Sequence, residues 1–335
     1  MQWKWSIAAL VAALVALFAA NLYFGAVSIP ASAVTDILMG GSGERASWGF
    51  IVWENRVPQA ITATLSGAGL AAAGLMLQTV FRNPLAGPSI LGIDGGANVG
   101  VALAMLLLGG TLTTGVFSLS GFLLVIVAAM VGAWAVMAVL IAFSRVLRSN
   151  TMLLITGVMI GYLASSAISL LNYGATEEGV RSFMVWGLGS FANVTVDRLP
   201  AFCTTMAVGI AGALLLIKPL NALLLGENYA SNLGINVRRT RTLLLIVTGL
   251  LTATSTAFCG PIAFVGLAVP HVARLILGTS DHRTLLPATL LTGSCLTLVC
   301  NLLSTLPSGS IIPINVLTPI LGAPVVIWVI LKMKS

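Results

Sequence analysis

Apolar residues occur in long uninterrupted runs along the whole chain, separated by short polar segments. Most runs approach 20 residues, the length with which a helix crosses a hydrocarbon core about 30 Å thick. The runs do not alternate with period two, which favours helices over a transmembrane barrel. We therefore predict an all-α, polytopic membrane protein with ten spans per subunit. The predicted spans are 6–25, 57–80, 93–109, 120–143, 151–172, 196–217, 240–258, 262–278, 284–305 and 314–331.

Composition supports this class of protein. Hydrophobic residues make up 58% of the 335 positions and charged residues only 7%, whereas about 25% of the residues of an ordinary soluble domain are charged. The polar segments between the runs are short, so the sequence leaves no room for a soluble domain. We predict a single transmembrane domain over residues 1–335.

The basic residues are distributed unevenly between the two sides of this topology. If the N-terminus is cytoplasmic, the cytoplasmic segments hold most of the 16 lysines and arginines. This positive-inside bias predicts a multi-pass protein of the cytoplasmic membrane with both termini in the cytoplasm, and it explains the net charge of +7 without a nucleic-acid partner. The cytoplasmic set is Lys4, Arg82, Arg145, Arg148, Lys218, Arg238, Arg239, Arg241, Arg274, Arg283, Lys332 and Lys334, and the outer set is Arg45, Arg56, Arg181 and Arg198.

A weak internal echo indicates a repeat. The sequence GPSILG at 87–92 follows the second span, and GPIAFVG at 260–266 follows the seventh. The predicted topology puts these segments on opposite sides of the membrane. Spans 2–5 and 7–10 are therefore predicted to be inverted copies, an arrangement common among transporters.

Chemically reactive groups are scarce in the spans. Ion-coupled carriers keep ionisable residues at mid-membrane, and the candidate here is Asp94, which we place at the inner mouth of span three. No phosphate-binding loop, GxSxG elbow or HExxH helix is present, and the four cysteines have no metal-ligand spacing. We predict no catalytic residue, no metal site and no enzymatic activity. If the protein moves a solute uphill, a partner must supply the energy, whereas an ion-coupled carrier and a non-transporting scaffold are the alternatives.

The cytoplasmic segment 219–234 is too short and too interrupted to span a membrane. It is predicted to form two short helices that are broken at Gly226 and closed by Gly234. Arg238, Arg239 and Arg241 follow the helices, which themselves carry no basic residue in this range. This pattern favours docking to a protein over an interfacial helix lying on the lipid.

Several short motifs in this order and spacing resemble one family over nearly the whole chain. They are RVP at 56–58, NPLA at 83–86, LGE at 225–227 with LG at 233–234, GPI at 260–262, FVGL at 264–267, VPHVAR at 269–274, DHR at 281–283, LP at 286–287 and LGAP at 321–324. The chain resembles the FecCD-type permease subunits of iron-siderophore, haem and cobalamin ABC importers.

The resemblance implies a homodimer with its translocation path along the two-fold axis, two cytoplasmic ATPase subunits that bind the ATP, and a substrate-binding protein that docks from outside. This subunit itself would carry no cofactor. Segment 219–234 would be the coupling segment. Its ATPase-coupling residues would be Leu225, Gly226, Glu227, Ala230, Leu233 and Gly234.

The resemblance also implies an inner gate at Asn83 and Leu85, after span two, and at Asn150 and Thr151, at the start of span five. The alternative for Asn83 and Asn150 is a helix-capping role, because Asn is a favoured N-cap residue. The two roles can coexist.

Arginines on the outer rim would dock the binding protein. Arg56 matches one family position, but Gln59 replaces a second arginine, and the turn at 307–313 is longer than usual and uncharged. Arg181 and Arg198 are the further docking candidates, although Glu177 and Glu178 can instead pair locally with Arg181.

The cargo is not marked by any motif. Iron chelates, either ferric siderophores or haem, are the expected cargo because they are commoner in the family, and cobalamin is the alternative. His271 is expected to be a hydrogen-bonded structural residue rather than a haem ligand. The expected pathway residues are small, polar and uncharged: Ser165, Ser166, Ser169, Asn172, Thr252, Thr254 and Ser255.

Overall fold

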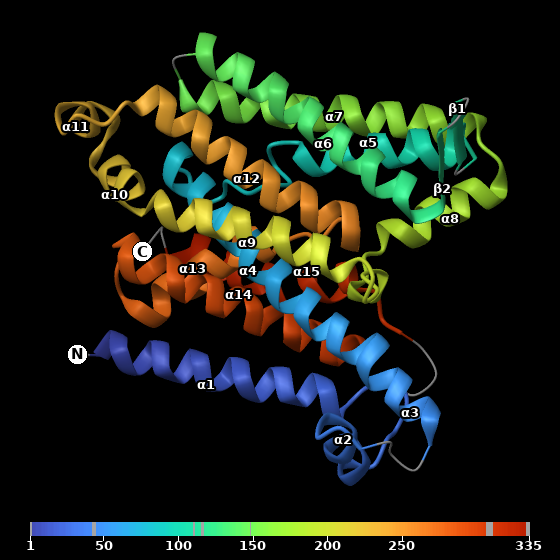
Figure 1. Cartoon of the computed structure of the whole chain (residues 1–335). Coiled ribbons are helices and arrows are strands. Elements are labelled where there is room, and N and C mark those ends of the chain that lie inside the picture. The colour runs from blue at the N-terminus through green and yellow to red at the C-terminus, as the bar shows by residue number, and fades with distance from the viewer. Residues whose placement is uncertain are drawn as a thin grey trace.

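The computed structural model describes residues 2–41, 45–109, 111–114, 117–147, 149–305 and 311–332, and these form a bundle of long helices (Figure 1). Within these described residues, six helical segments are long and apolar enough to cross a membrane alone. They are α1 (Gln2–Tyr23), α3 (Ala46–Phe50) continuing through a π-helical stretch (Ile51–Arg56) into α4 (Val57–Phe81), α6 (Gly121–Val146), α7 (Asn150–Gly174), α12 (Val237–Cys259) and α14 (His282–Thr305).

The other four predicted spans also contain helices, but these differ from simple crossings. Helices α9 (Leu199–Leu215) and α10 (Ile217–Leu225) form one pair bent by 47°. The remaining three are short apolar helices: α5 (Ile93–Ala102) with the π-helical stretch Leu103–Leu107, α13 (Val265–Leu277) and α15 (Ile314–Lys332). The helical polytopic fold is therefore confirmed, while the count of ten crossings stays a prediction.

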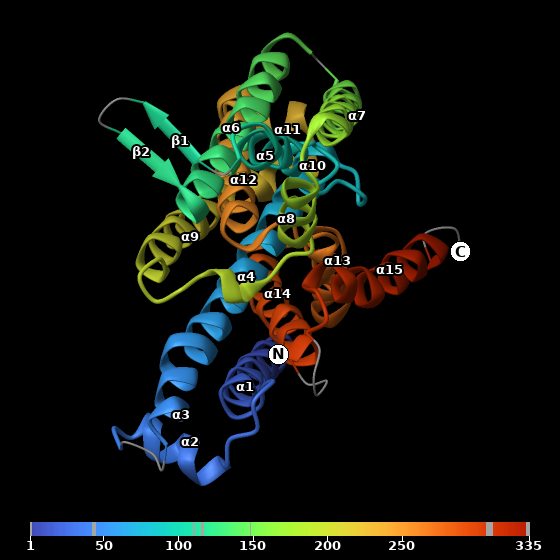
Figure 2. The ribbon, with the colours of Figure 1, turned by 90° about the vertical axis from the view of Figure 1, so that its right-hand side faces the viewer.

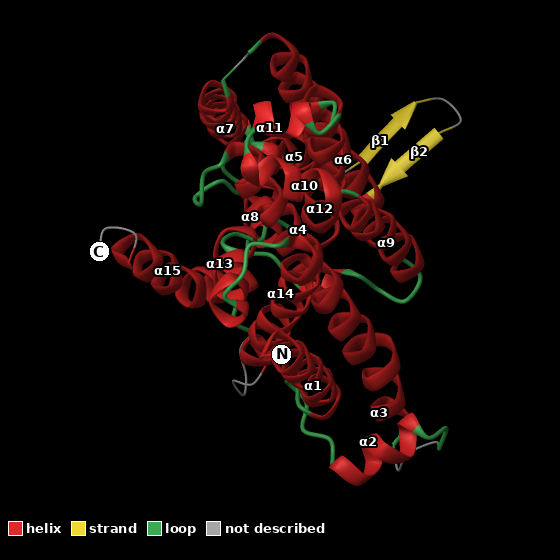
Figure 3. Ribbon diagram, turned by 90° about the vertical axis from the view of Figure 1, so that its left-hand side faces the viewer, coloured by secondary structure: helices red, strands yellow, loops and turns green. Residues whose placement is uncertain are grey.

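Short elements connect the spans. Helix α2 (Ala31–Leu38) follows α1, and α8 (Glu177–Gly187) and a 3₁₀ turn (Phe191–Asn193) lie between α7 and α9. Helix α11 (Glu227–Asn232) follows α10. The connection before α6 contains an antiparallel hairpin, β1 (Thr111–Thr114) paired with β2 (Phe117–Ser120), which the sequence analysis did not predict. The hairpin projects from the side of the bundle opposite to α15 (Figures 2 and 3).

The packing of the helices repeats between the two predicted copies. Helix α5 packs against α6 and α7, as α13 packs against α14 and α15. Helix α4 packs against α13 and α14, as α12 packs against α5 and α6. Helices α4 and α12 also contact each other and run in opposite directions (Figure 1). These matched contacts are what two inverted copies, spans 2–5 and 7–10, require.

Both copies contain a helix that starts inside the bundle. Gly92 (φ 74°) precedes α5 and Phe264 (φ 66°) precedes α13, each in the left-handed conformation. The backbone of Gly92 lies against Gly157 in α7, and that of Gly266 lies against Gly74 within α4. The chain after α4 thus turns back into the bundle before α5 begins. This corrects the placement of Asp94 at the inner mouth of span three.

We name the two ends of the bundle by residues. The end where α4 finishes and α12 begins is the Glu227 end, and the opposite end, where α4 follows from α3, is the Arg56 end. Helix α1 begins and α15 finishes at the Glu227 end, the end at which α10 and α11 also lie (Figure 1). This arrangement agrees with two termini on one side of the membrane.

Glycines allow the helices to approach closely within the subunit. A Cβ atom on Gly100 would lie 2.0 Å from the Ala128 carbonyl oxygen, and one on Gly74 would lie 1.7 Å from that of Gly266. Small residues at helix interfaces give membrane proteins such contacts because lipid supplies no hydrophobic driving force between helices.

Replacing Gly74 with Ala should therefore destabilise the protein. The added methyl group must push α4 away from the backbone of α13, and overpacking of this kind costs about 1–3 kcal/mol. Gly49→Ala is the matched control, because a Cβ atom there meets nothing within 4 Å. Thermal unfolding of the purified variants would check this, and equal melting temperatures would contradict the packing described.

Candidate functional site

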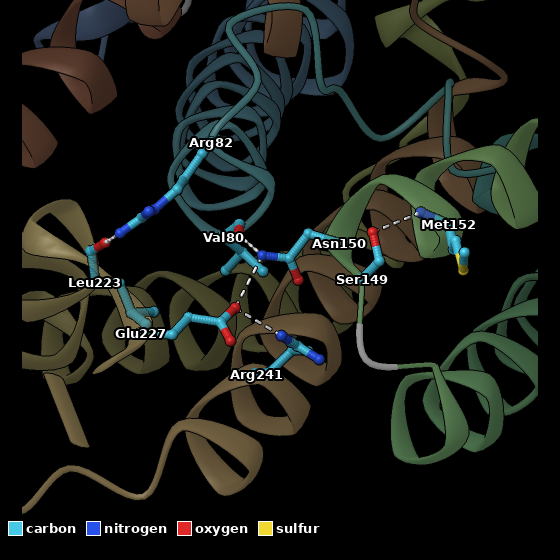
Figure 4. Close-up of polar contacts among 8 residues, drawn as sticks. All are labelled: Val80, Arg82, Ser149, Asn150, Met152, Leu223, Glu227 and Arg241. Carbon is cyan, nitrogen blue, oxygen red and sulfur yellow. Dashed lines mark hydrogen bonds and ion pairs between the residues drawn. The ribbon is translucent and has the colours of Figure 1, made fainter. Parts of the chain in front are cut away.

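Four segments far apart in the sequence meet at the Glu227 end: the last turn of α4, the first turn of α7, the α10–α11 break and the first turns of α12 (Figure 4). The break is at Gly226, whose φ of 123° is open to glycine and strained for other residues. A Cβ atom there would also lie 2.9 Å from Arg82 Nη2. The predicted pair of short helices broken at Gly226 is therefore what the structure contains.

Glu227 is the first residue of α11, and one of its oxygens joins three helices. Its Oε1 atom accepts hydrogen bonds from Arg241 Nη2 of α12 at 2.7 Å and from Asn150 Nδ2 of α7 at 2.9 Å. Hydrogen bonds to an ionised carboxylate are about twice as strong as neutral ones. The Arg241 side chain is largely buried, so this ion pair is better shielded from water than a surface pair.

Asn150 extends this connection to α4. Its Nδ2 atom also donates to the Val80 carbonyl oxygen at 3.0 Å, one of the last carbonyls of α4, which have no partner within their own helix. Arg82 similarly donates to the Leu223 carbonyl oxygen of α10 at 3.2 Å. Each of the segments that meet here is thus hydrogen-bonded to another.

The capping alternative for the two gate asparagines is wrong, because neither residue is the N-cap of a helix. Ser149 is the N-cap of α7, with its hydroxyl accepting from Met152 N at 3.5 Å, and Asn150 is the first helical residue. Asn83 accepts from Leu85 N at 2.9 Å, which forms a turn after α4 rather than a helix cap. Of the gate candidates, Asn150 bonds Glu227 in segment 219–234, whereas Leu85 and Thr151 are exposed.

A polar hollow of about 600 Å³ lies in front of this cluster. At this hollow and beside it, segment 219–234 exposes Leu225 (65%), Tyr229 (51%) and Leu233 (58%). Ala230 is fully buried, which restricts this predicted coupling residue to packing inside the subunit. The hollow is lined by Arg82, Asn150, Leu225, Gly226, Glu227, Asn228, Tyr229 and Asn232.

A second network ties α10 to α14 and α4. Asn221 Oδ1 accepts from the His282 backbone N–H at 2.8 Å and lies 2.9 Å from His282 Nδ1. His282 Nε2 lies 2.9 Å from Thr79 Oγ1. The backbone N–H of Arg283 and the amide of Asn221 hold the pKa of Asp281 below its ordinary range. This network is not among the features predicted from the sequence, although an Asp-His pair at a helix start is a usable signal.

The candidate docking arginines lie in very different environments. Arg56 is buried (6% exposed), and its guanidinium donates to the Leu22 and Tyr23 carbonyl oxygens at 2.8 and 3.0 Å and to that of Val27. It closes the end of α1, which corrects the expectation of a rim arginine. Arg181 is exposed, with no acidic side chain within 4 Å among the described residues, so the local pairing with Glu177 and Glu178 is absent.

Arg198 remains near the surface of the Arg56 end. Its Nε atom lies 3.8 Å from Asp197 Oδ2, and its guanidinium lies 4.2 Å from the centre of the Phe122 ring. An exposed pair at this distance contributes little to stability, which leaves the charge available to a partner. The predicted turn at 307–313 lies largely outside the described residues, as does Arg148.

Asp94 and His271 are both occupied within the fold. Asp94 is buried, and its two oxygens accept from Ser89 Oγ at 2.6 Å and Thr256 Oγ1 at 2.8 Å. His271 is also buried, with Nε2 2.8 Å from the Pro84 carbonyl oxygen. The contact of His271 fits the structural role expected for it.

The pathway candidates fall into two groups. Ser165, Ser166 and Ser169 lie on the exposed side of α7, a helix of which little is buried within the subunit. Thr252, Thr254 and Ser255 are instead buried in α12. Asn172 is half-buried.

The bundle, with two short helices that begin inside it and a hydrogen-bonded cluster at one end, is the fold of a membrane transport permease. The chain belongs to the FecCD transport family, whose model matches residues 13–332. The family resemblance is thereby confirmed.

The chain is also similar to curated relatives that are named as import permeases. The chain is 37% identical over 285 residues, 85% of its length and 83% of the relative's, to the vitamin B12 import system permease protein BtuC of Klebsiella pneumoniae. It is 36% identical over 286 residues to the protein of the same name from Salmonella paratyphi A, covering 84% of this chain and 83% of that one.

Two solved structures match the fold of this chain. An inward-facing ABC transporter of the metal-chelate type matches with a TM-score of 0.83 at 30% identity, over 98% of this chain and 99% of that one. PsaBC from Streptococcus pneumoniae matches with a TM-score of 0.56 at 16% identity, over 88% and 94%, which supports the fold alone. The chain is the permease component of an ABC importer and a multi-pass protein of the inner membrane.

Arg56→Ala should lower stability more than it weakens docking of any binding protein. Removing the guanidinium leaves two carbonyl groups at the end of α1 and one in the loop after it without their charged donor. A hydrogen bond to a charged group contributes about 1.5–3 kcal/mol. Arg181→Ala is the control, since that side chain is exposed. Melting temperatures of both variants would check this. A drop for Arg181→Ala alone would contradict it.

Proposed function

We propose that this permease works as a homodimer with two cytoplasmic ATPase subunits and an extracytoplasmic binding protein, and that it imports cobalamin. The Glu227 end faces the cytoplasm in this proposal. The observation that carries it is the Glu227 oxygen shared by Asn150 and Arg241, because it connects a surface segment directly to the start of α7.

The α10–α11 segment is the proposed ATPase-docking surface. Its exposed Leu225, Tyr229 and Leu233 provide an apolar contact, and the adjoining hollow offers polar groups to a side chain of the partner. A helix that only lay on lipid would need no such hollow. Protein interfaces combine an apolar centre with a polar rim in this way.

Movement of this segment would reach α7 through Asn150. Because Asn150 also bonds the last turn of α4, the start of α7 and the end of α4 would move together. Little of α7 is buried within its own subunit, so it can tilt without disrupting a core. Rocking of packed helices is an established mode of alternating access. The inner gate in this proposal is formed by Asn150, Thr151, Asn83 and Leu85.

The exposed face of α7 is the proposed lining of the path. Ser165, Ser166 and Ser169 lie on this face, and lipid offers hydroxyl groups no hydrogen-bond partner other than their own backbone. A second copy facing these residues across a two-fold axis would enclose them. On the outer side, Arg181 and Arg198 are proposed to meet the binding protein.

The character of this face agrees better with cobalamin than with haem. Helix α7 carries no charged residue along its 25 positions. Haem brings two carboxylates that would need compensating charges, whereas cobalamin brings mainly amide groups, which hydroxyls can serve. The names of the relatives point the same way, so the alternative from the sequence analysis is preferred to an iron chelate.

Replacing Glu227 with Ala should uncouple ATP hydrolysis from uptake. The change removes the hydrogen bonds to Asn150 and Arg241, so the docked segment can move without pulling α7. A hydrogen bond to a charged group contributes about 1.5–3 kcal/mol, and the variant loses this contribution to the link between α11 and α7. We therefore expect the amount of substrate taken up per ATP to fall roughly tenfold or more. Asn150→Ala should have the same effect.

The control is Glu54→Ala, which removes an exposed carboxylate at the opposite, Arg56 end that has no ion pair among the described residues. The measurement is the ratio of ATP hydrolysed to substrate accumulated in liposomes that contain the intact complex. An unchanged ratio in both the Glu227 and Asn150 variants would remove the coupling role from this cluster.

Parallel uptake assays should identify the cargo. Liposomes holding the permease with its ATPase and binding protein would be offered cobalamin, ferric siderophores and haem. We expect ATP-dependent accumulation of cobalamin, and accumulation of an iron chelate in its place would restore the first expectation.

Asp94→Asn should retain uptake because an amide can still bond Ser89 and Thr256. Uptake driven by an ion gradient and abolished by Asp94→Asn would indicate a secondary carrier.

A further inference from the structure

Three arginines from two helices surround a second hollow at the Glu227 end. Arg145 lies in the last turn of α6, and Arg238 and Arg239 lie in the first turn of α12. The hollow has a volume of about 430 Å³ and is completed by Asn236, Thr242 and Leu243. It is separate from the hollow beside Glu227, because the two share no lining residue.

The three arginines carry uncompensated positive charge. All three are exposed, and none has a carboxylate within 4 Å among the described residues. Arg241, one turn further along α12, differs because its side chain is largely buried and paired with Glu227. Like charges that converge on one hollow repel each other, so an anion bound between them would lower the free energy of the site.

The chemistry of the hollow suits a phosphate group. Guanidinium groups bind phosphate oxygens through paired N–H donors, and three of them approach from two sides. The Thr242 hydroxyl already donates to the Arg238 carbonyl oxygen at 3.1 Å, so the arginines are the donors left for a ligand. The Asn236 side chain is already engaged, since its Oδ1 atom accepts from Arg239 N at 2.9 Å and thereby holds the first turn of α12 in place.

The surroundings of the hollow are those of a lipid. Phe143 and Val146 of α6 and Leu243 and Ile246 of α12 are exposed apolar residues within one or two turns of the arginines. A free phosphate ion would make no use of them, whereas acyl chains would cover them. Basic pockets between helices at the cytoplasmic face are known sites for anionic lipid headgroups.

We infer that this hollow binds an anionic phospholipid, with the headgroup phosphate held by Arg145, Arg238 and Arg239 and the acyl chains along α6 and α12. The site does not depend on the cargo or on the ATPase. It would fasten the first turn of α12, which is followed one turn later by Arg241, to the end of α6.

The test is lipid binding by the full chain in the presence of defined lipids. Native mass spectrometry of the purified protein would count bound phosphatidylglycerol and phosphatidylcholine for the wild type and for the variant Arg145→Gln/Arg238→Gln/Arg239→Gln. A basic residue near an anionic lipid contributes about 1 kcal/mol, or roughly fivefold in affinity, so the triple variant should bind phosphatidylglycerol about 100-fold more weakly. Arg283→Gln is the matched control, an exposed arginine of the same end on α14.

Wild-type selectivity for phosphatidylglycerol over phosphatidylcholine, lost in the triple variant and kept in Arg283→Gln, would support the site. Equal binding of phosphatidylglycerol to wild type and variant would overturn it. Displacement of bound phosphatidylglycerol by millimolar inorganic phosphate would also overturn the proposal, in favour of a site for a free anion. So would a variant with unchanged lipid binding and weakened ATPase association, which would make the hollow a protein contact. A melting temperature equal to that of the wild type would show that the triple variant is folded.

Discussion

The constraint on which the structure depends is that backbone polar groups at membrane depth must be satisfied without water. Unwound backbone is tolerated there only where protein covers it, and this chain unwinds twice, before α5 and before α13. The coverage comes from close helix approach. Gly74 of α4 lies against Gly266, and Gly157 of α7 lies against the segment that precedes α5. Without these glycines the two short helices could not begin inside the bundle.

The same constraint explains which parts of the fold could be predicted. Length and hydropathy locate a helix in each of the ten segments predicted to be spans, and the helix break at Gly226 follows from its sequence neighbourhood. The depth of a residue in the membrane could not be predicted in this way. Hydropathy locates the apolar runs along the chain, but it does not show where the chain turns back into the bundle. Asp94 was placed at a membrane surface for that reason, although Ser89 and Thr256 enclose it within the bundle.

The long-range hydrogen bonds could not be predicted from the sequence either. Asn150 and Glu227 are 77 positions apart, and Asn221 and His282 are 61 apart. Nothing local to either sequence position indicates its partner. Arg56 shows the opposite error, because the family position suggested a surface charge and the fold turns its guanidinium onto carbonyl groups 29 to 34 positions away. The basic residues that define the positive-inside bias thus divide into those paired within the fold, such as Arg241, and those left free, such as Arg238.

The two networks at the Glu227 end also connect the two inverted copies. Glu227 of α11 bonds α7, the last helix of the first copy, and α12, the first helix of the second. Asn221 of α10 bonds His282 at the start of α14 in the second copy, and His282 contacts Thr79 of α4 in the first. A displacement of α10 and α11 as one body would therefore act on both copies at once. If α10 and α11 dock a partner, as proposed above, the paired networks would distribute the displacement of this one segment over four helices, α4, α7, α12 and α14, instead of one.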